Sequence, residues 1–333
     1  MKRPLLLLAL LFSLNAHAIP ETDYDRSFGT TVMPYFNTMM RGEFRNQQGL
    51  DIHWRGMIRP NATKTLVIFP GRTEASIKYA ELVYDLQSEN LNVFILDHQG
   101  QGESGRLFRN ADKCHVKRFS HYIEDAERFM KKVVLPNSKN TERVLLGHSM
   151  GGLIATHYVK RNPKHFAKVV LSAPMFQIKT PKITEWKSYL LAKSMWLLGK
   201  GSQYIPYGGR YKPERDVFEN NFTTSSELRF NTNKAVWLNE PRLQVGDPTI
   251  SWTMHSILWG RYVPSFAQKI KTPIMIIRAG NDRVVSGGRM ERFCSKAPHC
   301  KLVEIKDAGH GILDERDIYR DQAISHMKDF LAI

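Results

Sequence analysis

The sequence predicts an α/β fold in which a mostly parallel sheet is covered by helices on both faces. The first observation is that the strand-like runs are apolar throughout, as expected of strands buried on both faces. The second is that these runs alternate along the chain with segments of helical periodicity. The third is a break in this alternation over residues 175–262. We therefore expect a core made of residues 19–174 and 263–333, with a helical cap, residues 175–262, inserted into it.

The first part of the core follows a polar stretch that extends to about residue 42. From there, runs rich in Val, Ile, Leu and Phe alternate with helical patterns, and Pro or Gly closes several of them. In chain order we expect a strand at 66–69, a helix from 74 to about 90, a strand at 93–96, a helix at 119–133, a strand at 144–146, a helix from 150 to about 161 and a strand at 169–171.

The cap region is aromatic and rich in Lys and Arg, and it shows no strand–helix rhythm. After it the strand pattern returns at 273–277 and at 302–305, and a closing helix is expected at 318–331. Because the rhythm resumes unchanged, we interpret the cap as an insertion over one end of the sheet and not as an independent domain.

The first eighteen residues have the plan of a secretory signal peptide. A basic start precedes an apolar run from Leu5 to Leu14, and Ala16-His17-Ala18 offers a small-residue cleavage site. The run of roughly ten residues is about half of what spans a bilayer, so removal is favoured over a retained membrane anchor. We therefore expect residues 1–18 to direct export to the periplasm or the medium.

The formal net charge of +16 favours anionic partners, such as a phospholipid surface, a nucleic acid or an acidic polymer. The basic residues are scattered, and no nucleic-acid-binding module is recognisable, so we expect no nucleic-acid partner. Peripheral contact with an anionic membrane is one interpretation, and a basic surface without a specific partner is the other. Nothing in the sequence indicates the oligomeric state.

Three cysteines allow three pairings. In an oxidising compartment the close pair Cys294 and Cys300 is the favoured disulfide, which leaves Cys114 unpaired. The cysteines lack CxxC spacing and an accompanying His cluster, so we expect no metal and no cofactor.

The segment Gly147-His148-Ser149-Met150-Gly151 fits the pattern G-x-S-x-G between an expected strand and an expected helix. A sharp turn there would strain the backbone of Ser149 and lift its hydroxyl clear of the sheet. The flanking glycines are needed because side chains would clash across the turn. Ser149 is therefore the candidate nucleophile, and an ordinary Gly-rich turn is the alternative.

A serine hydroxyl needs a base, and imidazole serves best near neutral pH. In folds with this turn the chain order is Ser, acid, His. His310 follows the last expected strand among small residues and is preferred to His299 and His326. Asp282 follows the strand at 273–277 and is the expected acid that orients the imidazole.

Asp307, only three residues before His310, is the rival for the role of the acid, and we expect it to fix a turn instead.

The oxyanion of a tetrahedral intermediate needs two hydrogen-bond donors. We expect the backbone N–H groups of Met150 and of Arg72, in the loop 70–74, to supply them. Asp97 and His98 follow the second strand, and we expect them to hydrogen-bond that turn.

Together these motifs resemble the monoacylglycerol lipase and lysophospholipase group of α/β-hydrolases over roughly residues 40 to 333. The motifs that carry the resemblance are Phe69-Pro70-Gly71-Arg72-Thr73-Glu74, Leu96-Asp97-His98-Gln99-Gly100-Gln101-Gly102-Glu103-Ser104-Gly105-Arg106, Gly147-His148-Ser149-Met150-Gly151-Gly152, Ser172-Ala173-Pro174-Met175-Phe176 and the Asp282 and His310 turns. The resemblance implies a cap over the site, inserted before the strand that carries the acid. It also implies a lipid-like substrate, a lysophospholipid or a monoacylglycerol, whose single acyl ester is hydrolysed through an acyl-enzyme.

Two other functions stay open. A peptidase that releases N-terminal residues would need an acidic clamp, and the basic cap argues against one. A non-catalytic binding protein on the same scaffold usually lacks a triad member, whereas this sequence keeps all three. An apolar group in the cap either receives an acyl tail or forms the cap's own core. Its members are Trp186, Tyr189, Leu190, Leu191, Met195, Trp196, Leu197 and Leu198.

Overall fold

The computed structural model describes residues 19–180 and 183–333. The expected signal peptide, residues 1–18, lies outside the described residues, as do residues 181–182 of the expected cap.

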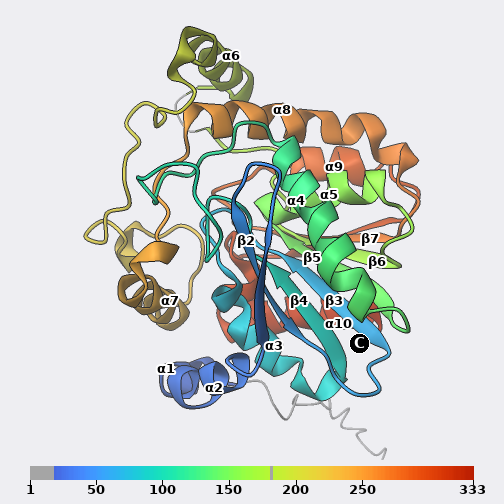
Figure 1. The fold of residues 1–333 in the computed structure, drawn as a ribbon. Helices are drawn as coiled ribbons and strands as arrows, with labels where there is room; N and C mark the ends of the chain where they lie inside the picture. Colours follow the sequence, from blue (N-terminus) through green and yellow to red (C-terminus); the bar gives the residue numbers. More distant parts are fainter. Residues whose placement is uncertain (1–18, 181–182) are drawn as a thin grey trace, which may run out of the picture.

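The described chain forms one sheet of eight strands, which confirms the predicted fold class (Figure 1). The strand order is β1-β2-β4-β3-β5-β6-β7-β8, in which β2 runs antiparallel to both its neighbours and the pairs from β4 to β8 are parallel. The strands are β1 (Met40–Arg45), β2 (Asp51–Met57), β3 (Lys64–Phe69), β4 (Leu91–Leu96), β5 (Glu142–His148), β6 (Lys168–Ser172), β7 (Ile274–Ala279) and β8 (Cys300–Ile305).

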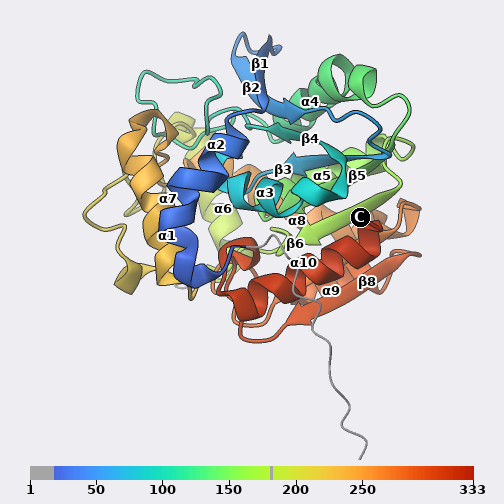
Figure 2. The ribbon, with the colours of Figure 1, turned by 90° about the horizontal axis from the view of Figure 1, so that it is seen from below.

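The described residues also form ten α-helices. They are α1 (Tyr24–Ser27), α2 (Met33–Phe36), α3 (Ala80–Asp85), α4 (Ser120–Phe129), α5 (Met150–Arg161), α6 (Glu185–Met195), α7 (Glu227–Asn239), α8 (Ile250–Phe266), α9 (Gly288–Cys294) and α10 (Asp317–Leu331). Helices α1, α2, α3 and α10 share a buried cluster on one face of the sheet, whereas α4, α5, α9 and the end of α8 share one on the other (Figures 1 and 2).

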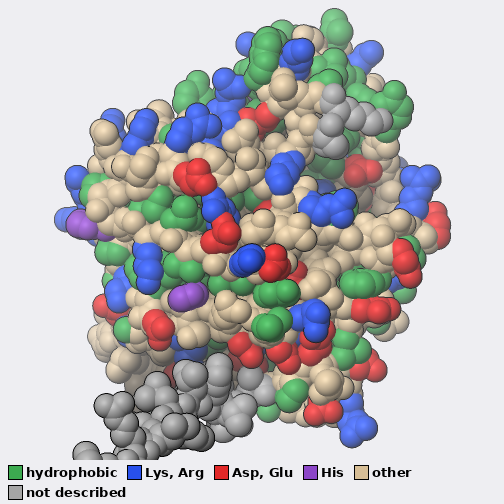
Figure 3. Space-filling model, turned by 180° about the vertical axis from the view of Figure 1, so that it is seen from behind, with side chains coloured by type: hydrophobic (Ala, Val, Ile, Leu, Met, Phe, Trp, Pro, Cys, Tyr) green, Lys and Arg blue, Asp and Glu red, His purple; other side chains and the backbone are tan. Residues whose placement is uncertain are grey.

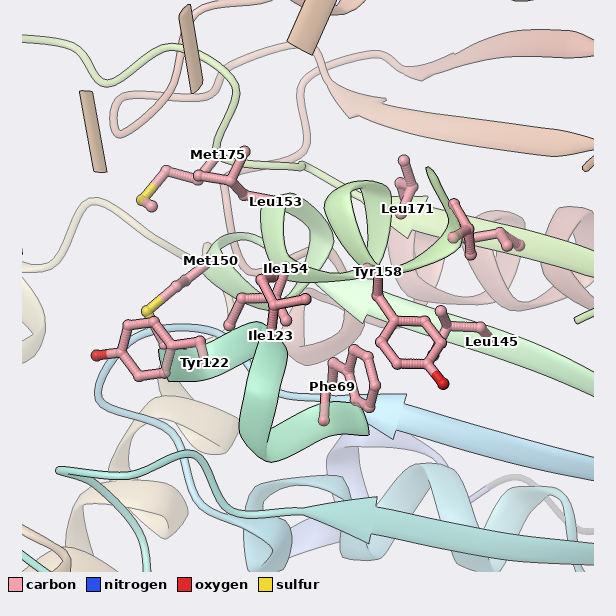
Figure 4. Close-up of a cluster of buried hydrophobic side chains, with 14 of the residues drawn as sticks. Phe69, Tyr122, Ile123, Leu145, Met150, Leu153, Ile154, Tyr158, Leu171 and Met175 are labelled. Atoms are coloured by element: carbon pink, nitrogen blue, oxygen red, sulfur yellow. The ribbon is translucent and has the colours of Figure 1, made fainter. Parts of the chain in front are cut away.

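The two clusters explain why the central strands are apolar along most of their length. Successive residues of one strand point to opposite faces. In β5, Leu145 belongs to the cluster with α5, and Val144 and Leu146 belong to the cluster with α10. Figure 4 shows Leu153, Ile154 and Tyr158 of α5 in the first of these clusters, beside Leu145.

The N-terminal part contains elements that the sequence did not predict. The expected polar stretch holds α1 and α2, joined by a wider helical turn, as well as the first half of β1. Tyr24, Phe28, Val32 and Phe36 are all buried in the cluster with α3 and α10. Their spacing of four places them on one face of a helix, and that periodicity was the available signal.

The insertion between β6 and β7 contributes α6, α7 and α8. The expected end of the cap at residue 262 lies inside α8, which continues to Phe266. Helix α8 contacts both parts: Ile250 and Met254 pack with Ala192 of α6, whereas Trp252, Val263 and Phe266 lie in the core cluster. One helix therefore joins the insertion to the core.

Cys294 at the end of α9 and Cys300 at the start of β8 form a disulfide, and Cys114 is free and buried. Of the helices described, none combines the length and the apolar character needed to cross a membrane.

Candidate active site

Ser149 is the single residue between β5 and α5. Its backbone angles are φ 50° and ψ −114°, a conformation that non-glycine residues rarely adopt. Two neighbours hold the turn: the Ser149 N–H donates to the Ser172 carbonyl at 2.9 Å, and the Met175 N–H donates to the Ser149 carbonyl at 2.9 Å. The strained turn leaves the Ser149 side chain at the carboxyl end of the sheet.

The glycines beside Ser149 are required by close backbone approaches. A Cβ atom on Gly151 would lie 1.9 Å from the Phe69 carbonyl oxygen, and one on Gly147 would lie 2.8 Å from the Gly151 carbonyl oxygen. Neither neighbour can move without displacing β3 or α5. The turn therefore tolerates no side chain at these two positions.

The structure brings Ser149, His310 and Asp282 together. His310 Nε2 lies 2.8 Å from Ser149 Oγ, and His310 Nδ1 lies 2.7 Å from Asp282 Oδ2. Asp282 follows β7 and His310 follows β8, whose carboxyl ends lie at the same sheet edge as that of β5. All three residues are buried.

Asp282 is held as a carboxylate with one oriented oxygen for His310. Its Oδ1 accepts the backbone N–H groups of Val284 at 2.7 Å and Val285 at 2.8 Å. Burial alone would raise the pKa of Asp282. The hydrogen bond and charge of His310, together with the two backbone donors, outweigh burial and lower that pKa below its ordinary value.

The loop that carries His310 is tied to the insertion by Glu315, which is fully buried. Glu315 Oε1 accepts the Gly309 N–H at 2.7 Å, and Oε2 accepts the Ser225 N–H at 2.9 Å. The Gly311 N–H also donates to the Thr223 carbonyl at 2.7 Å. The position of His310 is therefore coupled to the segment that leads into α7. Sequence reasoning missed Glu315.

The two expected oxyanion donors are near Ser149 in different ways: Met150 follows it in the chain, and Arg72 lines the same pocket. Met150 is the first residue of α5, where backbone N–H groups lack helical acceptors. In the other loop the Gly71 N–H donates to the Glu74 carboxylate. The Arg72 guanidinium donates to the Gly246 carbonyl at 3.1 Å and lies over the Trp252 ring. The guanidinium is thus engaged with the insertion, and the oxyanion roles of the Arg72 and Met150 N–H groups stay predictions.

Asp97 and His98 differ in what they do. Asp97 hydrogen-bonds its turn as expected, since it accepts the N–H groups of Ser76 at 2.6 Å and Glu103 at 2.8 Å. His98 instead packs between the rings of Phe69 and Tyr122. Burial lowers the pKa of His98 to about 4, so its ring is neutral at neutral pH.

A buried charged cluster lies beside the triad. Lys78 Nζ is 2.7 Å from Glu74 Oε1 and 2.8 Å from Asp314 Oδ2, and Tyr79 donates to Glu74 at 2.8 Å. Burial lowers the pKa of His148, next to this cluster, to about 4. Although burial opposes ionisation of Glu74, Lys78 and His148 lower its pKa to about 2. Lys78 therefore serves as the counter-charge of both carboxylates.

A pocket of about 210 Å³ opens beside Ser149 and His310. Core loops supply part of its wall, including Arg72 and Lys78, and the insertion supplies the rest. The α7 residues that line it are Phe230, Asn233, Lys234 and Trp237.

The apolar group of α6 neither lines this pocket nor forms a cap core as a whole. Ala192, Tyr189 and Met195 pack on α8. The exposed remainder consists of Trp186, Leu190, Leu191, Trp196, Leu197 and Leu198. The expectation that the group forms the cap's own core is therefore wrong for most of its members, because α8 lies between α6 and the sheet (Figure 1). The expectation that it receives an acyl tail stays a prediction.

Comparisons with known proteins agree with this geometry. A model of the family described as serine aminopeptidase, S33 matches residues 60–317. Lysophospholipase L2 of Escherichia coli (strain K12) is 36% identical over 276 residues, which are 80% of this chain and 80% of that protein. Monoacylglycerol lipase of Mycolicibacterium smegmatis is 25% identical over 241 residues, 71% of this chain and 78% of that protein.

A solved structure shares the fold. It is a soluble variant of monoglyceride lipase from Saccharomyces cerevisiae in complex with a substrate analogue. The TM-score is 0.70 at 17% identity, with 87% of this chain and 94% of that chain covered. The α/β-hydrolase fold and the resemblance to the monoacylglycerol lipase and lysophospholipase group are thereby confirmed.

Proposed function

Because the chain belongs to the hydrolase family described as serine aminopeptidase, S33, we propose that it is a serine esterase acting on single-chain lipids. The substrate is a lysophospholipid or a monoacylglycerol, and its one acyl ester is cleaved through an acyl-enzyme intermediate. The observation that carries the proposal is the hydrogen-bonded chain from Ser149 Oγ through His310 to Asp282, at 2.8 and 2.7 Å, beside a pocket.

In the first half of the reaction, Ser149 Oγ attacks the ester carbonyl while His310 Nε2 takes the hydroxyl proton. Asp282 keeps the proton of Nδ1 on the side away from Ser149 and stabilises the imidazolium. The backbone N–H groups of Met150 and Arg72 donate hydrogen bonds to the carbonyl oxygen and stabilise the negative charge that develops on it. His310 then protonates the departing glycerol oxygen, and the acyl group stays on Ser149.

In the second half, water takes the place of the alcohol. His310 removes a proton from the water, which attacks the acyl carbonyl. The second oxyanion that forms is stabilised by the same two N–H donors. The C–O bond to Ser149 breaks, Oγ recovers its proton from His310, and a fatty acid leaves. Besides the lipid ester itself, the reaction consumes only water.

The names of the relatives support a lipid ester as substrate, since one is a lysophospholipase and another a monoacylglycerol lipase. The family description favours a second candidate, a peptidase that releases N-terminal residues. A carboxylate in the pocket wall, Asp216, fits the acidic clamp that such a peptidase needs.

One substrate panel separates these functions. Purified enzyme is assayed with lysophospholipids, monoacylglycerols, two-chain phospholipids and aminoacyl amides, beside a Ser149→Ala variant. We expect hydrolysis of the two single-chain lipids, slower hydrolysis of two-chain phospholipids, and loss of turnover by several orders of magnitude in the variant. Faster cleavage of aminoacyl amides than of either single-chain lipid would replace the esterase by the peptidase.

The proposal includes peripheral contact with an anionic lipid surface through residues 183–200, the lipid-contact segment. Leu197 and Leu198 are 68% and 72% exposed, and five more large apolar side chains of the segment are exposed: Ile183, Trp186, Leu190, Leu191 and Trp196. Its three lysines, Lys187, Lys193 and Lys200, are exposed. Figure 3 shows apolar and basic side chains gathered at this end of the molecule.

The segment carries no exposed negative charge. Its one acid, Glu185, is buried and pairs with Arg289 at 2.6 Å. Exposed Trp and Leu side chains with lysines around them are typical of surfaces that enter the headgroup region, and each lysine near an anionic surface contributes about 1 kcal/mol at low salt.

Co-sedimentation with vesicles of phosphatidylglycerol and phosphatidylcholine tests the lipid-contact segment. We expect binding that weakens as salt rises and that falls roughly tenfold in Leu197→Ser/Leu198→Ser. Ile318→Ser, at an apolar side chain 63% exposed on α10, is the matched control and should bind like wild type. Equal binding of all three proteins would exclude the segment.

We also propose that the enzyme is exported to the periplasm or secreted. The support is the signal-peptide pattern of residues 1–18 and the Cys294–Cys300 disulfide, which suits an oxidising compartment. Cell fractionation of the full chain with N-terminal sequencing of the mature protein tests this. An N-terminus that still contains residue 1 in the cytoplasmic fraction would contradict it.

A further inference from the structure

The pocket beside Ser149 has a charged wall, and several of its charged side chains already have partners within the protein. Lys78 is shared between Glu74 and Asp314 within the buried cluster. The Arg72 guanidinium is engaged by the Gly246 carbonyl and the Trp252 ring. Each of these four side chains therefore already has a polar or charged partner within the protein.

Two further side chains of opposite charge lie in the same wall. Lys234 projects from α7, and Asp216 lies in the loop that leads to this helix. Within residues 19–180 and 183–333, no ion pair joins either side chain to a residue of opposite charge. In the described part of the chain, the Tyr211 hydroxyl donates a hydrogen bond to the Asp216 carboxylate at 2.6 Å, which orients the carboxylate without neutralising it. Both side chains are partly exposed in the pocket.

The pocket is also the wrong kind of site for a long acyl tail. Its volume of about 210 Å³ is below the roughly 300 Å³ at which pockets for drug-sized ligands begin. Phe230 and Trp237 are its large apolar lining residues, whereas polar and charged side chains form most of the remaining wall. A compact polar group attached to the reacting ester fits this composition better than a hydrocarbon chain does.

We infer that this pocket is a subsite for a zwitterionic head group, in which Lys234 binds the phosphate and Asp216 binds the amine. The inference rests on the proposed esterase function and narrows its substrate to lysophospholipids that carry phosphoethanolamine or phosphocholine. A phosphodiester carries one negative charge, which suits the compact ammonium of Lys234. The carboxylate of Asp216 faces the positive end of the same head group.

The two charges discriminate between head groups. The glycerol of a monoacylglycerol would leave both charges to water and gain nothing from either. The head group of lysophosphatidylglycerol would satisfy Lys234 and leave Asp216 without a cation. The order of preference among substrates with one acyl chain is therefore zwitterionic, then anionic, then neutral.

The test measures kcat/KM for lysophosphatidylethanolamine, lysophosphatidylglycerol and monoacylglycerol with the same short acyl chain, as monomers in solution, so that surface binding does not enter. The variants are Lys234→Met, which keeps the length of the side chain, and Asp216→Asn, which keeps its shape. Lys212→Met is the matched control, because Lys212 is exposed in the same loop as Asp216 and lies outside the pocket.

We expect Lys234→Met to lower kcat/KM roughly three- to tenfold for both phospholipids and to leave monoacylglycerol unchanged. Asp216→Asn should lower it by a similar factor for lysophosphatidylethanolamine alone. Equal losses on all three substrates, or no change in either variant, would overturn the head-group assignment while the esterase function stands. If wild type cleaves none of the three lipids, the proposed function itself has failed.

Discussion

Replacement of Asp282 by Asn should disable the enzyme without changing its shape. Asp282 Oδ1 accepts two backbone N–H groups, from Val284 and Val285, and Oδ2 faces His310 Nδ1 at 2.7 Å. An asparagine has only one acceptor oxygen. That oxygen must stay opposite the two backbone donors, so the NH₂ group is placed against His310.

The consequence is the wrong tautomer of His310. A ring nitrogen that accepts from the Asn NH₂ group carries no proton, so the proton moves to Nε2, which lies 2.8 Å from Ser149 Oγ. A protonated Nε2 cannot take the serine proton. Loss of the general base by this route lowers kcat by roughly 10³ to 10⁴, or about 4 to 5.5 kcal/mol of transition-state stabilisation.

The assay compares kcat on a short soluble ester for wild type, Asp282→Asn and Asp307→Asn. Asp307 is the matched control, because it is exposed and has φ 64°, a conformation that Asn tolerates well. We expect Asp307→Asn to keep wild-type activity, and thermal unfolding to verify that both variants are folded.

Either of two results would refute this reasoning. Asp282→Asn with a kcat within tenfold of wild type would show that the carboxylate does not set the tautomer. A large loss in Asp307→Asn, with Asp282→Asn active, would transfer the role to the rival acid.

Three further predictions concern stability and the supports of the site. Glu315→Gln should lower kcat more than it changes KM, and it should lower the unfolding free energy by about 1 to 3 kcal/mol, because an NH₂ group would face backbone donors. Steady-state kinetics measure the first effect and urea unfolding measures the second. Gly151→Ala should lower the unfolding free energy by more than about 3 kcal/mol through its clash with Phe69, whereas Gly288→Ala, with open space around it, should leave the urea midpoint nearly unchanged. Burial raises the pKa of Asp125 to about 7, so this carboxyl is protonated on folding at intermediate pH. The wild-type unfolding free energy should therefore fall from about pH 4 to pH 7 by up to about 4 kcal/mol relative to Asp125→Asn, as urea titrations at several pH values would show; parallel curves would contradict it.

The parts of the site that the sequence predicted have local causes. The Ser149 turn is bounded by an apolar strand and a periodic helix, and its glycines follow from steric contact across that turn. Asp282 and His310 each follow an apolar strand. Because the carboxyl ends of parallel strands share one edge, the order of the strands brings these two side chains to Ser149.

The parts that the sequence did not predict depend on distant contacts. Glu315 supports His310 through Ser225, ninety residues earlier, and no local pattern marks such a pair. Leu197 and Leu198 are as apolar as core residues, and only the position of α8 leaves them exposed. A local signal existed for the N-terminal helices in the spacing of four between Tyr24, Phe28, Val32 and Phe36, but polar neighbours obscured it.

The most direct test of the account is the site of reaction with a fluorophosphonate probe. Wild-type protein is labelled, digested and mapped by mass spectrometry, beside Ser149→Ala at the same concentration. The account predicts one adduct, on the peptide that contains Ser149, and no labelling of the variant. An adduct on another residue, or equal labelling of the variant, would contradict the claim that Ser149 is the nucleophile.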